Sequence, residues 1–182
     1  GEGEGEGEGE GEGEGILCDG SFTIPDQESV EGVEVCGIVT GDLTVSKSSL
    51  VTLSLSLLTQ VDGDLKVSDN DHLESLLLPN LTTVGGELEV RFNPALTIFQ
   101  CAGLRDVHGV LELRANDALS TISLPLLERI GERFDLYSND NLTLVDFAML
   151  KEVSEISLSA NNKLMSFAFP SLSDKVDTRV RI

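Results

Sequence analysis

The stretch from Asp62 to Ile130 repeats one pattern three times: DGDLKVSDNDHLESLLLPNLTTV at 62–84, GGELEVRFNPALTIFQCAGLRDV at 85–107 and HGVLELRANDALSTISLPLLERI at 108–130. Each copy has 23 residues, and a fixed period in this range is typical of solenoids, whose coils stack along one axis. A single coil cannot bury its apolar side, so neighbouring coils have to share one continuous core. The repeat therefore predicts an architecture before it predicts a function.

Each coil is expected to hold two short β-strands. Leu65 and Val67 form one period-2 pair and Leu76 and Leu78 form a second, which is the spacing of strands. No stretch of ten or more residues carries the apolar stripe of a helix. A polar corner separates the two strands, and a third bend closes the coil. The pattern extends to both sides of the three copies and predicts an all-β solenoid of about six coils over residues 16–182.

One asparagine recurs at the polar corner of five successive coils. Asparagine tolerates the left-handed backbone conformation and bonds readily to nearby backbone groups. Repetition at one corner therefore predicts an internal ladder of side chains, which we prefer to a row of amides presented to a ligand. The residues of this expected ladder are Asn70, Asn93, Asn116, Asn139 and Asn161.

Composition restricts the partners of the chain. The net charge is −20, and the seven Glu of the opening Gly-Glu tract account for part of it, leaving −13 for the rest. This charge argues against nucleic acid and anionic membrane surfaces as partners. No run of about 18 apolar residues is present, so we expect no membrane span in this chain. We divide the chain into a low-complexity arm, residues 1–15, and one solenoid domain, residues 16–182.

The cysteines and two glycosylation sequons point to the secretory route. Cys18 and Cys36 flank an irregular first coil, and we predict a disulfide between them. Cys101 occupies an apolar column of the repeat and is expected to be buried. Asn80-Leu-Thr and Asn141-Leu-Thr lie at turn positions and are predicted N-glycosylation sites. Together these features predict an extracellular or cell-surface location.

The two ends of the chain suggest self-assembly. Residues 1–15 alternate strictly between Gly and Glu, a composition that would need an external template to form a strand. An engineered tag is the alternative explanation of this arm. Val180 and Ile182 match the first strand of a further coil without its remainder. An uncapped solenoid end pairs readily with another molecule, so these features predict head-to-tail contacts and a homo-oligomer or filament.

The chain resembles the receptor L domain family, which includes the outer lobes of insulin- and epidermal-growth-factor-type receptors and fungal GPI-anchored cell-wall proteins. The resemblance rests on Cys18 and Cys36, on the Ile38-x-x-Gly41-x-Leu43-x-Val45 segment, and on the coils through Val176. It implies a right-handed β-solenoid and extracellular binding or structural work without catalysis. The receptors' cysteine-rich segments and a capping helix are not identified here, so hormone-type binding is not carried over. The leucine-rich repeat is the alternative fold, but its N-x-L spacing differs from the N-x-x-L of Asn70 to Leu73.

A line of carboxylates is the main candidate for site chemistry. Glu89, Glu112 and Asp135 fall on one outward column of the first strand, where stacked coils repeat every ~4.8 Å. Such oxygens are candidate Ca²⁺ ligands or an acid/base pair. We favour a solvated face, because Arg91 and Arg114 lie two residues away and are expected to neutralise the line. No cofactor is predicted.

Three functions follow from these features. The first is a non-enzymatic extracellular structural or adhesion protein that assembles head to tail into filaments. The second is a ligand-binding ectodomain module of a larger cell-surface protein, with a protein or a glycan as its ligand. The third, a carbohydrate-active enzyme that uses the carboxylate line, has the weakest support, because His72 and His108 are not placed to serve a nucleophile.

Overall fold

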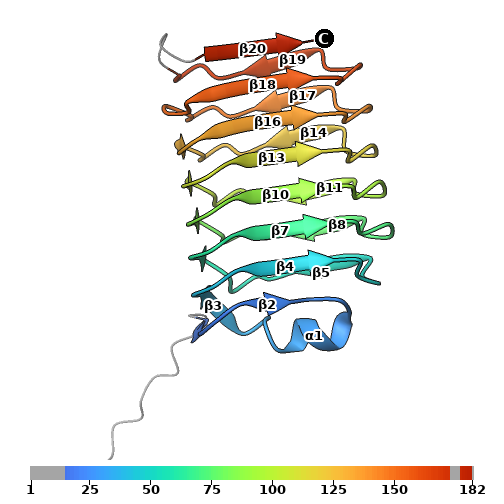
Figure 1. Cartoon of the computed structure of the whole chain (residues 1–182), viewed down its shortest axis with the longest axis vertical. Helices are drawn as coiled ribbons and strands as arrows, with labels where there is room; N and C mark the ends of the chain where they lie inside the picture. Colours follow the sequence, from blue (N-terminus) through green and yellow to red (C-terminus); the bar gives the residue numbers. More distant parts are fainter. Residues whose placement is uncertain (1–14, 173–176, 182) are drawn as a thin grey trace, which may run out of the picture.

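Each coil of the chain has three sides, and each side stacks on the equivalent side of the next coil (Figure 1). A computed structural model describes residues 15–172 and 177–181, with the backbone alone for 177–181. It shows a parallel β-solenoid of about seven turns, close to the expected six. The expected all-β solenoid is confirmed.

The long sheet has eight parallel strands: β2 (Phe22–Thr23), β4 (Leu43–Ser46), β7 (Leu65–Ser68), β10 (Leu88–Arg91), β13 (Leu111–Arg114), β16 (Arg133–Tyr137), β18 (Glu155–Ser159) and β20 (Asp177–Arg181). The narrow sheet has six: β1 (Ile16–Cys18), β3 (Cys36–Val39), β6 (Gln60–Val61), β9 (Thr83–Val84), β12 (Asp106–Val107) and β15 (Arg129–Ile130). The third side, here called the split sheet, has two halves. They are β5 (Thr52–Ser54), β8 (Ser75–Leu77) and β11 (Ile98–Gln100), and then β14 (Thr121–Ser123), β17 (Leu144–Asp146) and β19 (Ser166–Ala168).

The 23-residue period sets the register between coils. In the long sheet Leu88 pairs with Leu111, and Val90 pairs with Leu113, so like side chains stack directly on one another. These leucine and valine side chains are fully buried, whereas Glu112 between them is partly exposed. The aliphatic columns therefore form one core through the whole stack, as the period-2 pattern predicts.

The third side of the coil differs from the expectation. A simple bend was predicted there, but residues such as Thr83–Val84 form a short strand that pairs with its neighbours above and below. Val84 and its equivalents in the narrow sheet point into the core. Two residues carry too little pattern for a sequence argument, but the parallel stacking leaves their backbone groups facing the next coil.

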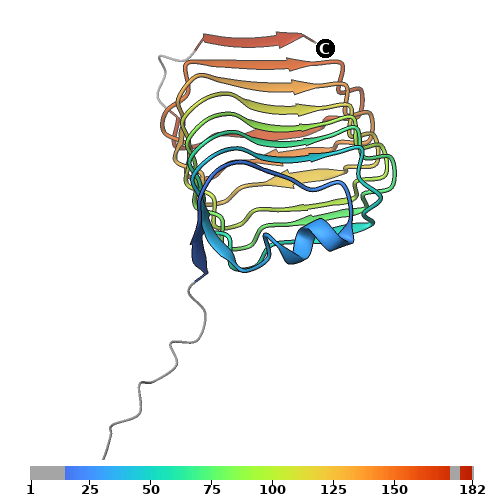
Figure 2. The ribbon, with the colours of Figure 1, turned by 60° about the horizontal axis from the view of Figure 1, so that its bottom comes forward.

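A short helix at the N-terminal end was also missed. Helix α1 (Gln27–Glu31) lies in the first coil between β2 and β3, where later coils carry a strand of the split sheet (Figures 1 and 2). The Asp26 carboxylate caps it by accepting bonds from the Ser29 amide, at 3.0 Å, and the Ser29 hydroxyl, at 2.7 Å. Val30 is buried in the core. A five-residue helix is too short to show the periodicity on which the sequence argument relied.

A disulfide closes this first coil. Cys18 ends β1 and Cys36 begins β3, the neighbouring strand of the narrow sheet, and the two residues are bonded with their Cα atoms 5.7 Å apart. The disulfide and the buried Val30 of α1 both belong to the N-terminal end of the core. The expected arm, apart from Gly15, and Ile182 lie outside the described residues. Val180 lies in β20, where its backbone pairs with Leu158 of β18.

Candidate functional site

The outer face of the long sheet carries two columns of side chains that run along the stack. The first contains the predicted acidic line, and the second lies two residues further along each strand. The strand register places Thr44, Lys66, Glu89, Glu112, Asp135 and Ser157 in the first column and Ser46, Ser68, Arg91, Arg114, Tyr137 and Ser159 in the second. An acidic column therefore runs beside one that is basic and aromatic.

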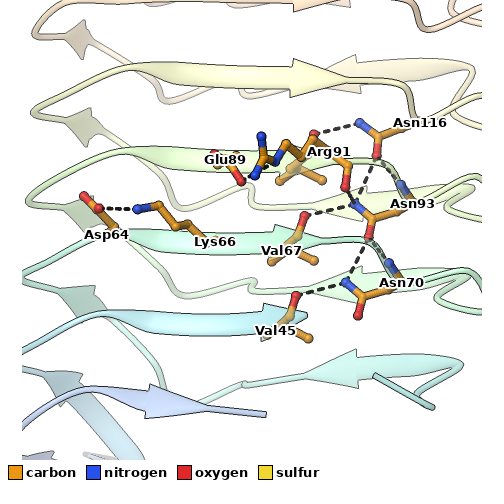
Figure 3. A network of polar contacts seen from close by, with 10 residues as sticks. Val45, Asp64, Lys66, Val67, Asn70, Glu89, Arg91, Asn93 and Asn116 are labelled. Carbon is orange, nitrogen blue, oxygen red and sulfur yellow. Dashed lines mark hydrogen bonds and ion pairs between the residues drawn. The ribbon is translucent and has the colours of Figure 1, made fainter. Parts of the chain in front are cut away.

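Two of the three predicted carboxylates form ion pairs with arginines. Arg91 Nε lies 2.7 Å from Glu89 Oε1, and Arg133 pairs with Asp135 (Figure 3 shows the first pair). Burial raises the pKa of Glu89, with Arg91 opposing this shift and the nearby Glu112 adding to it. Among residues 15–172, no three His, Cys, Asp or Glu side chains lie close enough to hold a metal ion. The structure therefore does not assemble the acidic line into a metal site.

Lys66 and Arg114 make no ion pair with the three predicted carboxylates. The Lys66 ammonium bonds to Asp64 of its own strand end, at 2.7 Å, which raises the pKa of Lys66 and lowers that of Asp64 (Figure 3). Arg114 was expected to neutralise the carboxylates, but its guanidinium lies over aromatic rings instead. Cζ is 5.2 Å from the ring centroid of Phe92 and 5.1 Å from that of Tyr137.

We name Arg91, Phe92, Arg114 and Tyr137 the Arg–aromatic cluster. Arg91 Cζ is 5.8 Å from the Phe92 ring, so two guanidinium groups flank one phenyl ring. Phe92 is 38% exposed and Tyr137 42%, in a chain with only 4% aromatic residues. Such cation–π stacks hold the side chains in place while leaving the rings open to solvent. Sequence reasoning missed this cluster, although Tyr137 is the only tyrosine and falls in register with Arg114.

Two hollows border the Arg–aromatic cluster. One, of about 280 Å³, lies on the sheet face, and its lining combines two carboxylates with a cation, an aromatic ring and two serines: Glu112, Asp135, Arg114, Tyr137, Ser157 and Ser159, with Leu136. The other, of about 760 Å³, is an open groove along the asparagine corner, and Phe92 forms part of its wall. The cluster therefore touches both a polar sheet surface and a corner groove, and a ligand on it could contact either.

The asparagine corner is a buried ladder. Asn93 Nδ2 donates to Asn116 Oδ1 at 3.1 Å and to the Val67 carbonyl of the previous coil at 3.0 Å (Figure 3). Asn116 donates in the same way to Asn139 Oδ1 and to the Val90 carbonyl. The same contacts extend the ladder to Asn70 at one end and Asn161 at the other. The ladder is therefore structural, and its amides are not presented to a ligand.

The left-handed conformation falls on the residue before each asparagine rather than on the asparagine. Phe92 has φ 52° and Ala115 φ 51°, and the equivalent residues of the other coils have similar values. Six of the described coils therefore have a left-handed residue at this point, and five of the six use a small or polar side chain or lysine. The backbone conformation at this position therefore does not require the phenyl ring of Phe92, and the presence of an aromatic residue there needs a different explanation.

Both sequon asparagines are exposed in turns, but their side chains bond to the neighbouring coil. Asn80 Nδ2, the atom that would carry a glycan, donates to the Ser56 carbonyl at 2.8 Å. Asn141 Nδ2 donates to the Asp117 carbonyl at the same distance. These bonds give both asparagines a structural role as well, and their glycosylation stays a prediction.

The sequence model of the receptor L domain family matches residues 35–144, from the start of the regular coils to β17. This segment is more than half of the chain and contains the whole Arg–aromatic cluster. Comparison with curated proteins and with solved structures gave no significant match.

The chain belongs to the receptor L domain family. This is a family of non-catalytic, ligand-binding domains that are typically extracellular, and the Cys18–Cys36 disulfide fits such a location. In the part of the chain that the structure describes, no helix has the length and apolar character needed to cross a membrane.

Proposed function

We propose that the chain is a non-catalytic ligand-binding module of an extracellular protein, and that its ligand binds to the outer face of the long sheet at the Arg–aromatic cluster. The observation that carries this proposal is the exposure of Phe92 and Tyr137 around Arg114. Arginine and aromatic residues are the types enriched at the centres of protein interfaces. The face is also continuous, because its eight strands are joined throughout.

The energetics favour recognition at this position. The rings are held by cation–π contacts before any ligand arrives, so little side-chain freedom would be lost on binding. The cluster also concentrates two cationic side chains on a chain of net charge −20. A protein or glycan surface with an apolar patch beside acceptor oxygens would complement the rings and the free N–H groups of Arg114.

Binding measurements with cluster variants test this proposal. The purified module is first screened on arrays of secreted proteins and of glycans, and the hits are titrated by surface plasmon resonance. Arg114→Ala and Tyr137→Ala are each expected to weaken binding about 30-fold or more, the loss typical of an anchor residue.

The matched control is Arg105→Ala, which removes an exposed arginine from the narrow-sheet side, where it pairs with Glu128. This variant should bind like the unchanged protein. Unchanged affinity in both cluster variants, with unchanged melting temperatures, would place the binding site elsewhere.

Head-to-tail assembly into filaments is a second proposal, supported by the parallel stacking itself. The long sheet ends at β2 and β20, and two molecules could pair these strands edge to edge. At the N-terminal end α1 already fills the split-sheet side of the first coil, which limits such a contact to the other two sides. Electron microscopy tests the idea: loss of polymers on deletion of residues 1–15 supports it, and a monomer before and after deletion contradicts it.

A further inference from the structure

The split sheet is interrupted at one step of the stack. Strands β5, β8 and β11 pair with one another, as do β14, β17 and β19, but β11 and β14 share no ladder. On the other two sides of the same step the strands do pair, β10 with β13 and β12 with β15. The interruption is therefore local to one face and does not come from a change in the spacing of the coils as a whole.

The backbone bonds that should cross this step are missing. One coil earlier, the Leu78 amide donates to the Gln100 carbonyl at 2.8 Å, and one coil later Leu124 donates to Asp146 at 3.1 Å. The equivalent bond from the Cys101 amide to the Ser123 carbonyl is absent from the described coils. The unpaired edges of β11 and β14 run in the same direction and face each other.

A core substitution coincides with the interruption. The inward column of this side runs through Leu53 and Leu76 to Phe99, and then continues with Ile122. Phe99 is 8% exposed, while Leu76 and Ile122 are fully buried. A phenyl ring is larger than the aliphatic side chains on either side of it. We attribute the opening between the strands to this ring, which no longer fits within one coil spacing.

The opening is a hollow of about 450 Å³ with an uncharged lining. It is bordered by Thr97, Ile98 and Gln100 on one edge and by Ser120, Thr121 and Ser123 on the other. Hydroxyl, amide and apolar side chains line it, and no carboxylate or cation is among them. This lining is unsuited to a metal ion or a charged ligand. Free strand edges with such a lining match the backbone and side chains of another strand.

We propose that the opening between β11 and β14 binds an extended, uncharged peptide segment of a partner protein, which pairs its backbone with the free edges of the two strands. The unpaired amides and carbonyls supply the affinity, because an added strand gains main-chain hydrogen bonds at a free sheet edge. The neutral lining supplies the selectivity, because a charged side chain would lose hydration there without gaining a partner. This site lies on a different face from the Arg–aromatic cluster and does not depend on the function proposed above.

Residue-resolved hydrogen exchange with a defined peptide tests the proposal. The probe is the capped peptide ALSTISL, the chain's own residues 118–124, which has strand-forming residues and no charge. At a concentration that occupies about nine in ten molecules, exchange of the Cys101 amide should slow about tenfold. The Leu78 amide, already bonded within the sheet, should not change.

A peptide of the same sequence with every backbone nitrogen methylated is the matched control. It keeps the side chains but cannot donate the ladder bonds, so it should not slow exchange at Cys101. Equal protection by both peptides would show contact through side chains alone and would overturn the strand-pairing proposal. No protection by either peptide at millimolar concentration would overturn it as well.

Two variants separate the opening from general stability. Phe99→Leu restores the side chain found at Leu76, should close the ladder and should abolish protection by the peptide. Phe147→Leu makes the same change at another buried ring and should leave peptide binding unchanged. If Phe99→Leu folds and still binds the peptide as the unchanged protein does, the proposal fails.

Discussion

The long sheet and the split sheet are two sides of the same coils, yet they differ in continuity and in charge. The long sheet joins eight strands without a break and carries an acidic column beside the Arg–aromatic cluster. The split sheet is broken into halves of three strands, and Asp146 is the one charged residue at the outward positions of β5, β8, β11, β14, β17 and β19. The inward side chains stabilise the stacking of the coils. The outward residues, together with the core residue Phe99, determine what each face can bind.

The largest expected effect concerns the thiol beside the opening. Burial raises the pKa of Cys101 to about 12 from an ordinary 9.0, so its thiolate is about a thousandfold scarcer at neutral pH. Labelling with a thiol reagent should be slower by at least that factor in the folded protein than in urea with the disulfide intact. Comparable rates in both conditions would show that the opening exposes the core, which the structure excludes.

Next come the inward and outward positions of the long sheet. Leu113→Ala removes a fully buried side chain from the middle of the stack and should lower the free energy of unfolding by about 2–5 kcal/mol. Glu112→Ala, one residue away on the partly exposed face, should change it by less than about 0.5 kcal/mol. Chemical denaturation measures both variants, and equal losses would refute the alternation of the strand.

The asparagine ladder joins the two faces and gives a smaller effect. Asn116→Ala removes a buried donor to the Val90 carbonyl and a buried acceptor from Asn93 Nδ2, and should cost about 2–4 kcal/mol. Asn161→Ala should cost less, because Asn161 is only partly buried and water can replace its bonds. The two thermal unfolding curves check this order, and a larger loss at Asn161 would contradict it.

The smallest effect is a dependence on pH at Glu89. Its folded pKa lies above the ordinary 4.5, so its ionised form opposes folding at neutral pH, and this penalty disappears as pH falls through the folded pKa towards 4.5. Glu89→Gln should therefore be slightly more stable than the unchanged protein at pH 7. The gain should vanish below pH 4.5, as measured by melting temperature across pH. A variant that is less stable at pH 7 would mean that the Arg91 pair outweighs burial.

Sequence reasoning reached the parts of the fold that repeat. The 23-residue period, the inward columns of Leu65 and Val67, and the corner occupied by Asn70 each recur often enough for position to predict environment. The structure has the solenoid, and its asparagines bond from coil to coil. A repeat pattern predicts the features that all coils have in common.

Features confined to one coil could not be predicted in this way. Helix α1 depends on Asp26 as a cap and on a single short turn, and the opening coincides with one ring, Phe99, between the aliphatic side chains of Leu76 and Ile122. The Arg–aromatic cluster needs Phe92 to lie beside Arg114, which follows from the left-handed corner and the strand register together. The contact between Phe92 and Arg114 depends on how the fold places the two residues, and the presence of a phenylalanine or an arginine in the sequence does not indicate it.

Hydrogen exchange of the free protein tests the break in the split sheet most directly. Leu78, Cys101 and Leu124 occupy the same column in three successive coils, and the amides of the first and third donate to the following coil. The account predicts that the Cys101 amide exchanges at least about a hundredfold faster than the other two, because its bond across the step is missing. Equal protection at all three positions would show a continuous sheet and would contradict the account.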